Sequence, residues 1–246
     1  MKNLKNDIIK FIKEYVENAH AKGVVLGMSG GKDSFIVAAL AAEAIGANNV
    51  FGIIMPNGNQ KDINDAIFEC ELLKIKYSIS NIENLYNETI SLTKSALDTN
   101  NLSKITTLNI APRLRMNLLY SAAATLGYLV ANTSNLSERM VGYSTKWGDS
   151  VGDFSPLLSL TKTEVEELGK ELGLPENLVC KKPADGLTGS TDEEVLGFSY
   201  NELDDFIRNG KKGKNFDKIL KMHKSSNHKR NPIKAFDCGR KNYFDN

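Results

Sequence analysis

The stretch VVLGMSGGKDS, residues 24–34, decides the fold of this chain. Its first five residues are apolar apart from one glycine, a run typical of a buried strand. Two glycines then indicate a turn, and the Ala-rich residues 35–44 predict a helix. A loop between such a strand and helix is expected at the carboxyl end of a parallel sheet, which is where these sheets bind ligands.

Apolar runs and amphipathic segments alternate along much of the remaining chain. Strands are expected at residues 50–55, 77–79 and 128–131, and helices at residues 4–15, 62–73, 109–126, 162–172, 200–207 and 216–224. This alternation predicts an α/β fold with a doubly wound parallel sheet of about five strands flanked by helices. No internal repeat divides the chain, so residues 1–246 are expected to form a single domain.

The composition favours a cytoplasmic protein that does not enter a membrane. Hydrophobic residues make up 41% of the 246 residues and charged residues 25%, as in ordinary globular proteins. No run approaches the roughly 18 consecutive apolar residues of a membrane span, and the start of the chain does not resemble a signal peptide. Three widely separated cysteines, Cys70, Cys180 and Cys238, argue against disulfides and against a zinc site.

The net charge of +1 hides an uneven distribution. Residues 208–241 form a basic C-terminal segment with twelve Lys or Arg and two Asp, whereas residues 1–207 hold 19 basic and 27 acidic residues. A basic segment can bind nucleic acid, close over a phosphate-bearing ligand or simply face solvent. The sequence leaves these three possibilities open.

The loop after the first strand is a candidate phosphate-binding site, formed by Ser29, Gly30, Gly31, Lys32, Asp33 and Ser34. The start of a helix attracts anions, and glycines let the backbone approach phosphate oxygens. Asp33 would repel a polyphosphate unless a divalent cation bridged the two, so Mg²⁺ is implied. Neither the Walker A pattern nor Gly-x-Gly-x-x-Gly occurs in the chain. The alternative is a glycine-rich turn that only caps a helix.

The hexapeptide resembles the PP-loop of the N-type ATP pyrophosphatases, which have an adenine nucleotide alpha hydrolase-like fold and split ATP into AMP and pyrophosphate. Other stretches look like successive segments of one branch, the NAD⁺ synthetases: residues 55–62, 109–116, 133–138, 141–162, 191–197 and 228–230. The resemblance runs from about residue 24 to about residue 232. One departure is the loop before Thr191, where family members usually carry Ser or Thr after a proline and this chain has Ala184 after Pro183.

The resemblance implies roles for individual residues. ATP contacts are implied for Ser29, Gly30, Gly31, Lys32, Ser34, Met55, Gln60, Arg115, Thr133 and Lys162. Contacts to the second substrate are implied for Lys146, Asp149, Asp153 and Glu193. Asp33 and Glu138 are implied as Mg²⁺ ligands and, with Lys162, as the catalytic residues. By residue type alone Glu138 also fits a helix-capping residue, and the charges at 146–153 also fit a solvated loop.

The resemblance also implies an activity, the ATP-dependent amidation of nicotinic acid adenine dinucleotide by ammonia. An acyl-adenylate forms, and NAD⁺, AMP and pyrophosphate are released. Family members are homodimers, and the small residues from Ser121 to Thr125 make the helix 109–126 the candidate contact. Glutamine-using members add an N-terminal nitrilase-like domain, for which the 28 residues before Ser29 are expected to leave no room.

Two other functions remain open at the level of sequence. A tRNA-modifying PP-loop enzyme is favoured by the basic segment, but not by the acidic body or by the lack of a Cys-x-x-Cys pair. A non-catalytic adenine-nucleotide-binding module would need the glycine loop but not Asp33 and Glu138 together.

Overall fold

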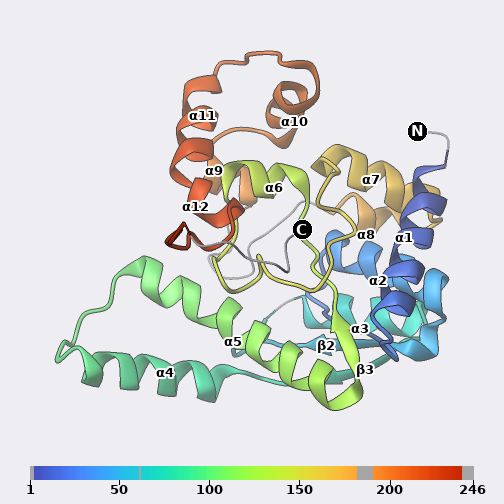
Figure 1. Ribbon diagram of the computed structural model, residues 1–246, viewed down its shortest axis with the longest axis horizontal. Coiled ribbons are helices and arrows are strands. Elements are labelled where there is room, and N and C mark those ends of the chain that lie inside the picture. The colour runs from blue at the N-terminus through green and yellow to red at the C-terminus, as the bar shows by residue number, and fades with distance from the viewer. Residues whose placement is uncertain (1–2, 61, 182–190, 240–246) are drawn as a thin grey trace.

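The computed structural model describes residues 3–60, 62–181 and 191–239 (Figure 1). A parallel sheet stands at its centre, with the strand order β3-β2-β1-β4. The strands are β1 (Gly23–Gly27), β2 (Val50–Ile54), β3 (Lys76–Ile79) and β4 (Tyr128–Val130). They match the expected positions, and the doubly wound α/β fold is confirmed. The described residues hold four strands rather than about five, and a single parallel bridge between Ala131 and Phe154 lies just beyond β4.

Alternating residues of β1 pack on opposite faces of the sheet. Val24 and Leu26 belong to the larger apolar cluster, and Val25 belongs to a second one. Helices α1 (Leu4–Asn18), α2 (Lys32–Ile45), α3 (Ile63–Leu72) and α7 (Lys162–Glu171) contribute to the first cluster. Helix α5 (Lys104–Leu126) contributes to the second. A strand buried on both faces is what the apolar run at 24–28 predicted.

Helices α4 (Glu83–Ala96) and α5 form a long antiparallel pair along one side of the molecule (Figure 1). The sequence analysis did not predict α4, none of whose residues is buried. Helix α5 begins five residues earlier than the expected start at residue 109, and Ser103 caps it by accepting a hydrogen bond from Thr106 N.

A third, smaller apolar cluster lies above the carboxyl ends of the strands. It contains Val141, Leu196, Phe198, Tyr200, Leu203 and Ile219. The helices around it are α6 (Leu136–Val141), α9 (Asp192–Leu196), α10 (Tyr200–Asn209), α11 (Phe216–Ser225) and α12 (Asn227–Arg230), at the top of Figure 1. The remaining short elements are η1 (Ala47–Asn49) and α8 (Glu176–Val179).

The strand order creates a topological switch point at β1. The chain runs from β1 outward to β2 and β3, then returns to place β4 on the other side of β1. The connections that follow β1 and β4 therefore leave the sheet in different directions, which opens a crevice beyond their carboxyl ends. The loop 29–34 leads out of β1 at this crevice.

No described helix combines the length and apolar character needed to cross a membrane.

Candidate active site

A cleft of about 970 Å³ opens beyond the carboxyl ends of β1 and β4. The loop 29–34 forms part of its wall, together with residues 130–134, Glu138, residues 142–145 and residues 148–149. Residues of α5 from Lys104 to Leu119 contribute another side. Every residue that the resemblance implied for ATP lines this cleft. Residues that come from distant parts of the sequence are thus brought together at one site.

The loop 29–34 is tightly folded on itself. Ser29 Oγ lies 3.1 Å from Ser34 Oγ, and Gly31 N donates to Ser29 Oγ at 3.3 Å. Gly30 has φ +74°, and a Cβ at this position would lie only 2.4 Å from the carbonyl oxygen of Asp62. Glycine is therefore required here both by the backbone conformation and by the close approach of the segment that begins α3.

The second residue of α2, Asp33, faces the cleft, but its neighbour Lys32 points elsewhere. The Lys32 ammonium pairs with the carboxylate of Glu166 on α7, and the lysine side chain is only 4% exposed. Lys32 lines the cleft, yet its charge is engaged in this ion pair. Its implied contact with ATP therefore rests on its backbone, whose N–H lies at the helix N-terminus.

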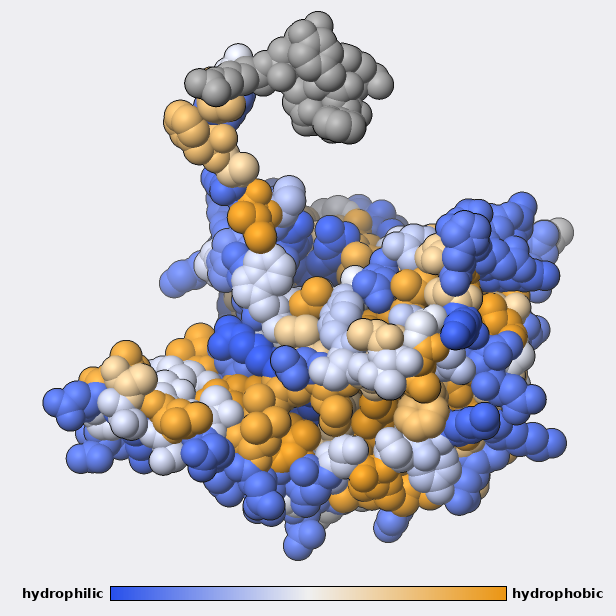
Figure 2. Space-filling view, turned by 60° about the horizontal axis from the view of Figure 1, so that its bottom comes forward, coloured by the Kyte–Doolittle hydropathy of each residue, from blue (hydrophilic) through white to orange (hydrophobic). Residues whose placement is uncertain are grey.

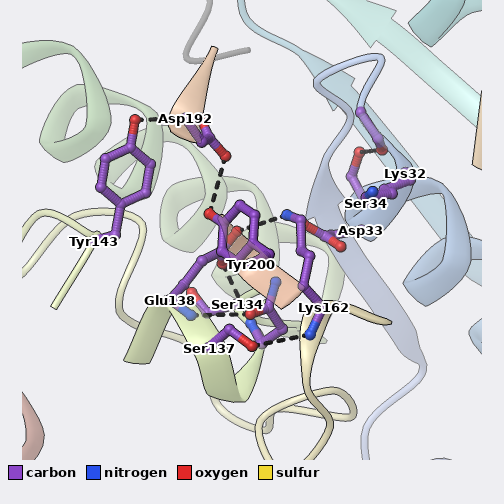
Figure 3. Close-up of polar contacts among 12 residues, drawn as sticks. Lys32, Asp33, Ser34, Ser134, Ser137, Glu138, Tyr143, Lys162, Asp192 and Tyr200 are labelled. Carbon is purple, nitrogen blue, oxygen red and sulfur yellow. Dashed lines mark hydrogen bonds and ion pairs between the residues drawn. The ribbon is translucent and has the colours of Figure 1, made fainter. Parts of the chain in front are cut away.

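Three predicted catalytic side chains meet at the centre of the site (Figure 3). Lys162 Nζ lies 2.7 Å from Asp33 Oδ2 and 2.9 Å from Glu138 Oε1. Burial lowers the pKa of Lys162, but the two carboxylates outweigh this effect, so the net shift is upward and the ammonium is charged. An unpaired charge at such a buried position would be costly, and the three groups offset one another.

Glu138 both caps a helix and reaches the centre of the site. Its Oε2 accepts from Asn135 N at 3.3 Å, and Asn135 Oδ1 accepts from Glu138 N, so the two residues form the capping box of α6. Its other oxygen pairs with Lys162. Burial raises the pKa of Glu138; the Lys162 ammonium opposes this rise, and the Asp33 carboxylate adds to it. Capping fixes the backbone position from which the second oxygen reaches the cleft.

Buried polar residues that the sequence did not single out support this triad. Tyr200 donates to Asp192 Oδ2 at 3.1 Å, and the Lys162 ammonium lies 5.2 Å from the centre of the Tyr200 ring. Behind the lysine, Ser137 Oγ accepts from Lys162 N and donates to Asp204 Oδ1. Asp192 lies in a stretch already quoted for the resemblance, but Tyr200 and Asp204 carry no sequence signal beyond helical spacing.

Arg115 on α5 is another cation that lines the cleft. Its Nε donates to the carbonyl of Met55 at 2.9 Å, and its terminal nitrogen lies 3.5 Å from Gln60 Oε1. Burial lowers the pKa of Arg115, with the charge of Asp149 opposing this, but an arginine stays protonated. These contacts leave part of the guanidinium fork to bind an anion in the cleft.

The residues implied for the second substrate do not all lie in the cleft of the single chain. Asp149 lines it, and its Oδ1 accepts from Thr145 N at 2.6 Å. Lys146, Asp153 and Glu193 are not among the lining residues. The Asp153 carboxylate accepts from Val130 N at 2.7 Å, and Glu193 Oε1 accepts from Tyr200 N at 2.8 Å. Lys146 Nζ lies 5.2 Å from the centre of the Trp147 ring.

Part of the basic C-terminal segment folds back onto α6. Lys229 Nζ donates to the carbonyls of Gly142 and Ser144 at 2.7 and 2.6 Å. Arg230 donates to the carbonyls of Arg139, Met140 and His223. These cations meet the carbonyl end of the helix that carries Glu138, where positive charge is favourable. Lys229 also lines the cleft, so one residue of this segment belongs to the site.

Comparison with known proteins agrees with this geometry. The sequence matches the family described as NAD synthase over residues 4–237. The chain belongs to the NAD synthase family. The NH(3)-dependent NAD(+) synthetase of Finegoldia magna (strain ATCC 29328 / DSM 20472 / WAL 2508) is 43% identical over 96% of this chain and 97% of its own.

Two solved structures share the fold of this NAD synthase family chain over most of their length. A structure of NMN synthetase from Francisella tularensis has a TM-score of 0.89 and 34% identity, over 96% of this chain and 98% of that one. A structure of the NH3-dependent NAD synthetase from Campylobacter jejuni subsp. jejuni NCTC 11168, in complex with the nitrate ion, has a TM-score of 0.78 and 30% identity over the same shares.

The residues of this NAD synthase family chain fit a magnesium ion that is shared with a nucleotide. Oδ1 of Asp33 is buried and has no hydrogen-bond partner among the described residues, and Glu138 brings a second carboxylate to the same lysine. No group of three or more His, Cys, Asp or Glu in the described residues could hold a metal alone. Two carboxylates completed by substrate phosphates are a usual set of ligands for Mg²⁺.

The three cysteines are free thiols, with Cys70 buried and the other two exposed. The expected departure at Pro183 and Ala184 lies outside the described residues.

Proposed function

We propose that this chain catalyses the amidation of nicotinic acid adenine dinucleotide by ammonia, at the expense of ATP, to give NAD⁺, AMP and pyrophosphate. The observation that carries the proposal is the meeting of Asp33, Glu138 and Lys162 beside a glycine-rich helix start at the switch point of a NAD synthase family sheet. The pair of carboxylates distinguishes this site from one that only binds an adenine nucleotide.

In the first step the nicotinate carboxylate attacks the α-phosphorus of ATP. The bond from the α-phosphorus to the bridging oxygen breaks, and pyrophosphate leaves with that oxygen. The N–H groups at the start of α2 and the hydroxyls of Ser29 and Ser34 hold the phosphates, while Lys162 and Arg115 supply positive charge. Asp33 and Glu138 would hold Mg²⁺, which would offset the charge on the phosphates when bound.

In the second step ammonia attacks the activated carbonyl carbon. The resulting tetrahedral centre loses a proton and expels AMP, which leaves the carboxamide of NAD⁺. A carboxylate is a poor acyl donor because its oxygen is a poor leaving group, and adenylation replaces that oxygen with a good one. No protein nucleophile is needed, so the chain has mainly to position reactants and stabilise charge.

The proposal is tested by incubating the protein with MgATP, the dinucleotide and ammonium, and by measuring NAD⁺ and AMP. We expect equal amounts of the two products. Free ammonia, and not glutamine, is expected to support turnover by the isolated chain. Efficient synthesis from glutamine after removal of contaminating ammonia would contradict the claim that ammonia is the nitrogen source. If no acid substrate led to the release of AMP, the proposed amidation itself would be wrong.

A second candidate substrate is nicotinic acid mononucleotide, whose amide is NMN. It is favoured by the high structural similarity to the Francisella protein, a NMN synthetase by its description. The chemistry at the carboxylate is the same for both acids, so the choice depends on whether the adenylate half of the dinucleotide adds binding energy. Comparing kcat/KM for the two acids decides this, and a higher value for the mononucleotide would replace the dinucleotide in our proposal.

A homodimer forms part of the proposal. Small, exposed residues on α5, including Ser121, Ala124 and Thr125, permit close packing of a second copy. Apolar surface gathers on the α4–α5 side of the molecule in Figure 2, where Leu92 is 61% exposed. We expect sedimentation to give a dimer, and Ala124→Arg to yield monomer, whereas Glu171→Arg on the exposed side of α7 leaves the dimer intact. A wild-type monomer at micromolar concentration would contradict this.

Nucleic acid is not a partner in this proposal, because Lys229 and Arg230 donate their hydrogen bonds within the chain. A salt-dependent shift of labelled tRNA by the protein would revive the RNA-modifying alternative. A cytoplasmic location suits the reaction, since ATP is made and used there.

A further inference from the structure

Lys181 lies where three separate segments of the chain meet. Its Nζ is 2.5 Å from Asp62 Oδ1 and 2.6 Å from Asp65 Oδ2, at the start of α3. The same nitrogen lies 3.4 Å from the carbonyl oxygen of Gly30 in the phosphate loop. Lys181 follows α8 and lines the cleft, as Asp62 also does. No role was expected for this residue from the sequence.

The three contacts account for every proton of the ammonium group. A lysine has three N–H donors, and here two meet carboxylates and one points at a carbonyl. Partial burial lowers the pKa of Lys181, but the hydrogen bonds to Asp62 and Asp65 outweigh it, so the group is charged. A lysine whose donors are all engaged by the protein is suited to fixing its neighbours rather than to binding a ligand directly.

Those neighbours would otherwise oppose ATP. Asp62 lies on the wall of a cleft that has to accept a polyphosphate, and Asp65 adds a second negative charge at the same lysine, just behind this wall. One turn further along α3, Glu69 is fully buried, and burial together with the nearby Asp65 raises its pKa to about 8, so it adds little negative charge at neutral pH. The balance of charge at this wall therefore depends on Lys181.

The same contacts couple the wall to the loop mechanically. Gly30 approaches Asp62 so closely that even a methyl group would collide with the Asp62 carbonyl. A movement of Asp62, driven by repulsion from Asp65 or from phosphate, would therefore displace the loop whose N–H groups bind the phosphates.

We propose that Lys181 is a positioning residue for ATP, which offsets the charges of Asp62 and Asp65 and holds the start of α3 against the phosphate loop. This role rests on the proposed function only in that ATP is the ligand of the loop. Lys181 acts on the nucleotide through its two carboxylate partners and not by direct contact with phosphate.

The test uses three variants of the full chain: Lys181→Met, Asp62→Asn/Asp65→Asn, and the triple combination. The Kd of MgATP is measured by calorimetry without the dinucleotide, so that no turnover occurs. We expect Lys181→Met to weaken ATP binding by roughly tenfold at low salt, since about 1.4 kcal/mol of charge repulsion is exposed. Removing the two carboxylates as well is expected to restore the wild-type Kd to within about twofold.

A direct phosphate contact predicts a different pattern. In that case the triple variant would bind ATP as poorly as Lys181→Met, and our proposal would be wrong. It would also be wrong if Lys181→Met bound ATP like the wild type. Thermal unfolding of each variant identifies any loss of folded protein. The Kd of MgATP for the Asp62→Asn/Asp65→Asn variant shows whether ATP binding tolerates neutral side chains at these two positions.

Two further measurements separate positioning from a general loss of structure. Lys181→Met is expected to raise the KM for ATP and to leave the KM for the acid substrate unchanged, whereas a distorted fold would raise both. The matched control is Lys211→Met, which breaks an ion pair with Asp205 on the far surface of α10 and should leave ATP binding unaltered. The calorimetry needs no amidation. A chain that binds ATP but forms no NAD⁺ would therefore refute the proposed function, and the proposed role of Lys181 could still be tested on it.

Discussion

The ammonium nitrogen of Lys162 lies 2.7 Å from Oδ2 of Asp33 and bridges from there to Glu138. An ammonium in this position takes up oxygen atoms that a divalent cation would need for ligation by both carboxylates. The phosphates of ATP offer Lys162 an alternative partner in the same cleft. The lysine and the metal should therefore compete for the acids until a nucleotide is bound.

The first prediction concerns metal binding without nucleotide. Lys162→Met is expected to tighten the binding of Mn²⁺, used as a spectroscopic substitute for Mg²⁺, by about tenfold or more, because the competing cation is gone. Binding is measured by electron paramagnetic resonance at pH 8. Lys32→Met serves as the control, since Lys32 is equally buried but pairs with Glu166 instead. Equal Mn²⁺ affinity in wild type and Lys162→Met would contradict the competition.

The second prediction concerns the two acids. Asp33→Asn and Glu138→Gln are each expected to lower kcat by roughly a hundredfold or more, as losses of single electrostatic contributors do elsewhere. The fold should survive, because glutamine can still close the capping box of α6. Initial rates over a Mg²⁺ titration, with circular dichroism as a check on folding, measure the effect. Full activity of either variant at limiting Mg²⁺ would remove that residue from the metal site.

The third prediction separates two aspartates that the sequence placed in one substrate loop. Asp149 lines the cleft, so Asp149→Asn should raise the KM for the acid substrate by about tenfold and leave the Kd of ATP unchanged. The Asp153 carboxylate accepts hydrogen bonds from Val130 N and the Tyr120 hydroxyl. Asp153→Asn should therefore lower the free energy of unfolding by about 1–3 kcal/mol. Steady-state kinetics and urea unfolding distinguish them. An unchanged free energy of unfolding for Asp153→Asn would show that these hydrogen bonds do not stabilise the fold.

The fourth prediction concerns the pH dependence of stability. Burial raises the pKa of Glu69 from 4.5 to about 8 in the folded chain, so the folded state binds a proton that the unfolded state releases. The free energy of unfolding should therefore fall as the pH rises from about 4.5 to about 8. Glu69→Gln should remove this slope and be more stable than wild type above pH 8, by a few kcal/mol. Glu88→Gln, at an exposed position on α4, should keep the wild-type slope.

Much of the sheet and the phosphate loop could be predicted because local signals determine them. An apolar run buried on both faces, followed by a glycine turn, describes β1 and its loop without reference to the rest of the chain. Helix α4 escaped prediction although its apolar residues follow a helical spacing. It has no buried residue, and its many Asn, Ser and Thr residues have a low helix propensity. Residues 142–155, which follow α6, form no helix or strand and contain only turns, bends and one bridge, in keeping with their Gly, Ser and Asp content.

The site was harder to predict, because its contacts join residues more than a hundred positions apart. Lys162 and Asp33 are separated by 129 residues, and Lys181 and Asp62 by 119. No spacing rule pairs such residues, so only the resemblance suggested the first pair, and nothing suggested the second. The direction of the Lys32 side chain was equally invisible, since it depends on Glu166 in another helix.

The hydrogen bonds from Arg230 to the end of α6 have a consequence for how the chain is made. Arg230 donates to the carbonyl of Arg139, which lies 91 residues earlier in the chain. During synthesis the ribosome therefore releases the strands and the phosphate loop well before the segment that secures the helix bearing Glu138. A nascent chain can bury its sheet early, whereas Glu138 takes its final position beside Asp33 only after residues 229 and 230 have emerged. Activity should therefore appear later than the folding of the sheet.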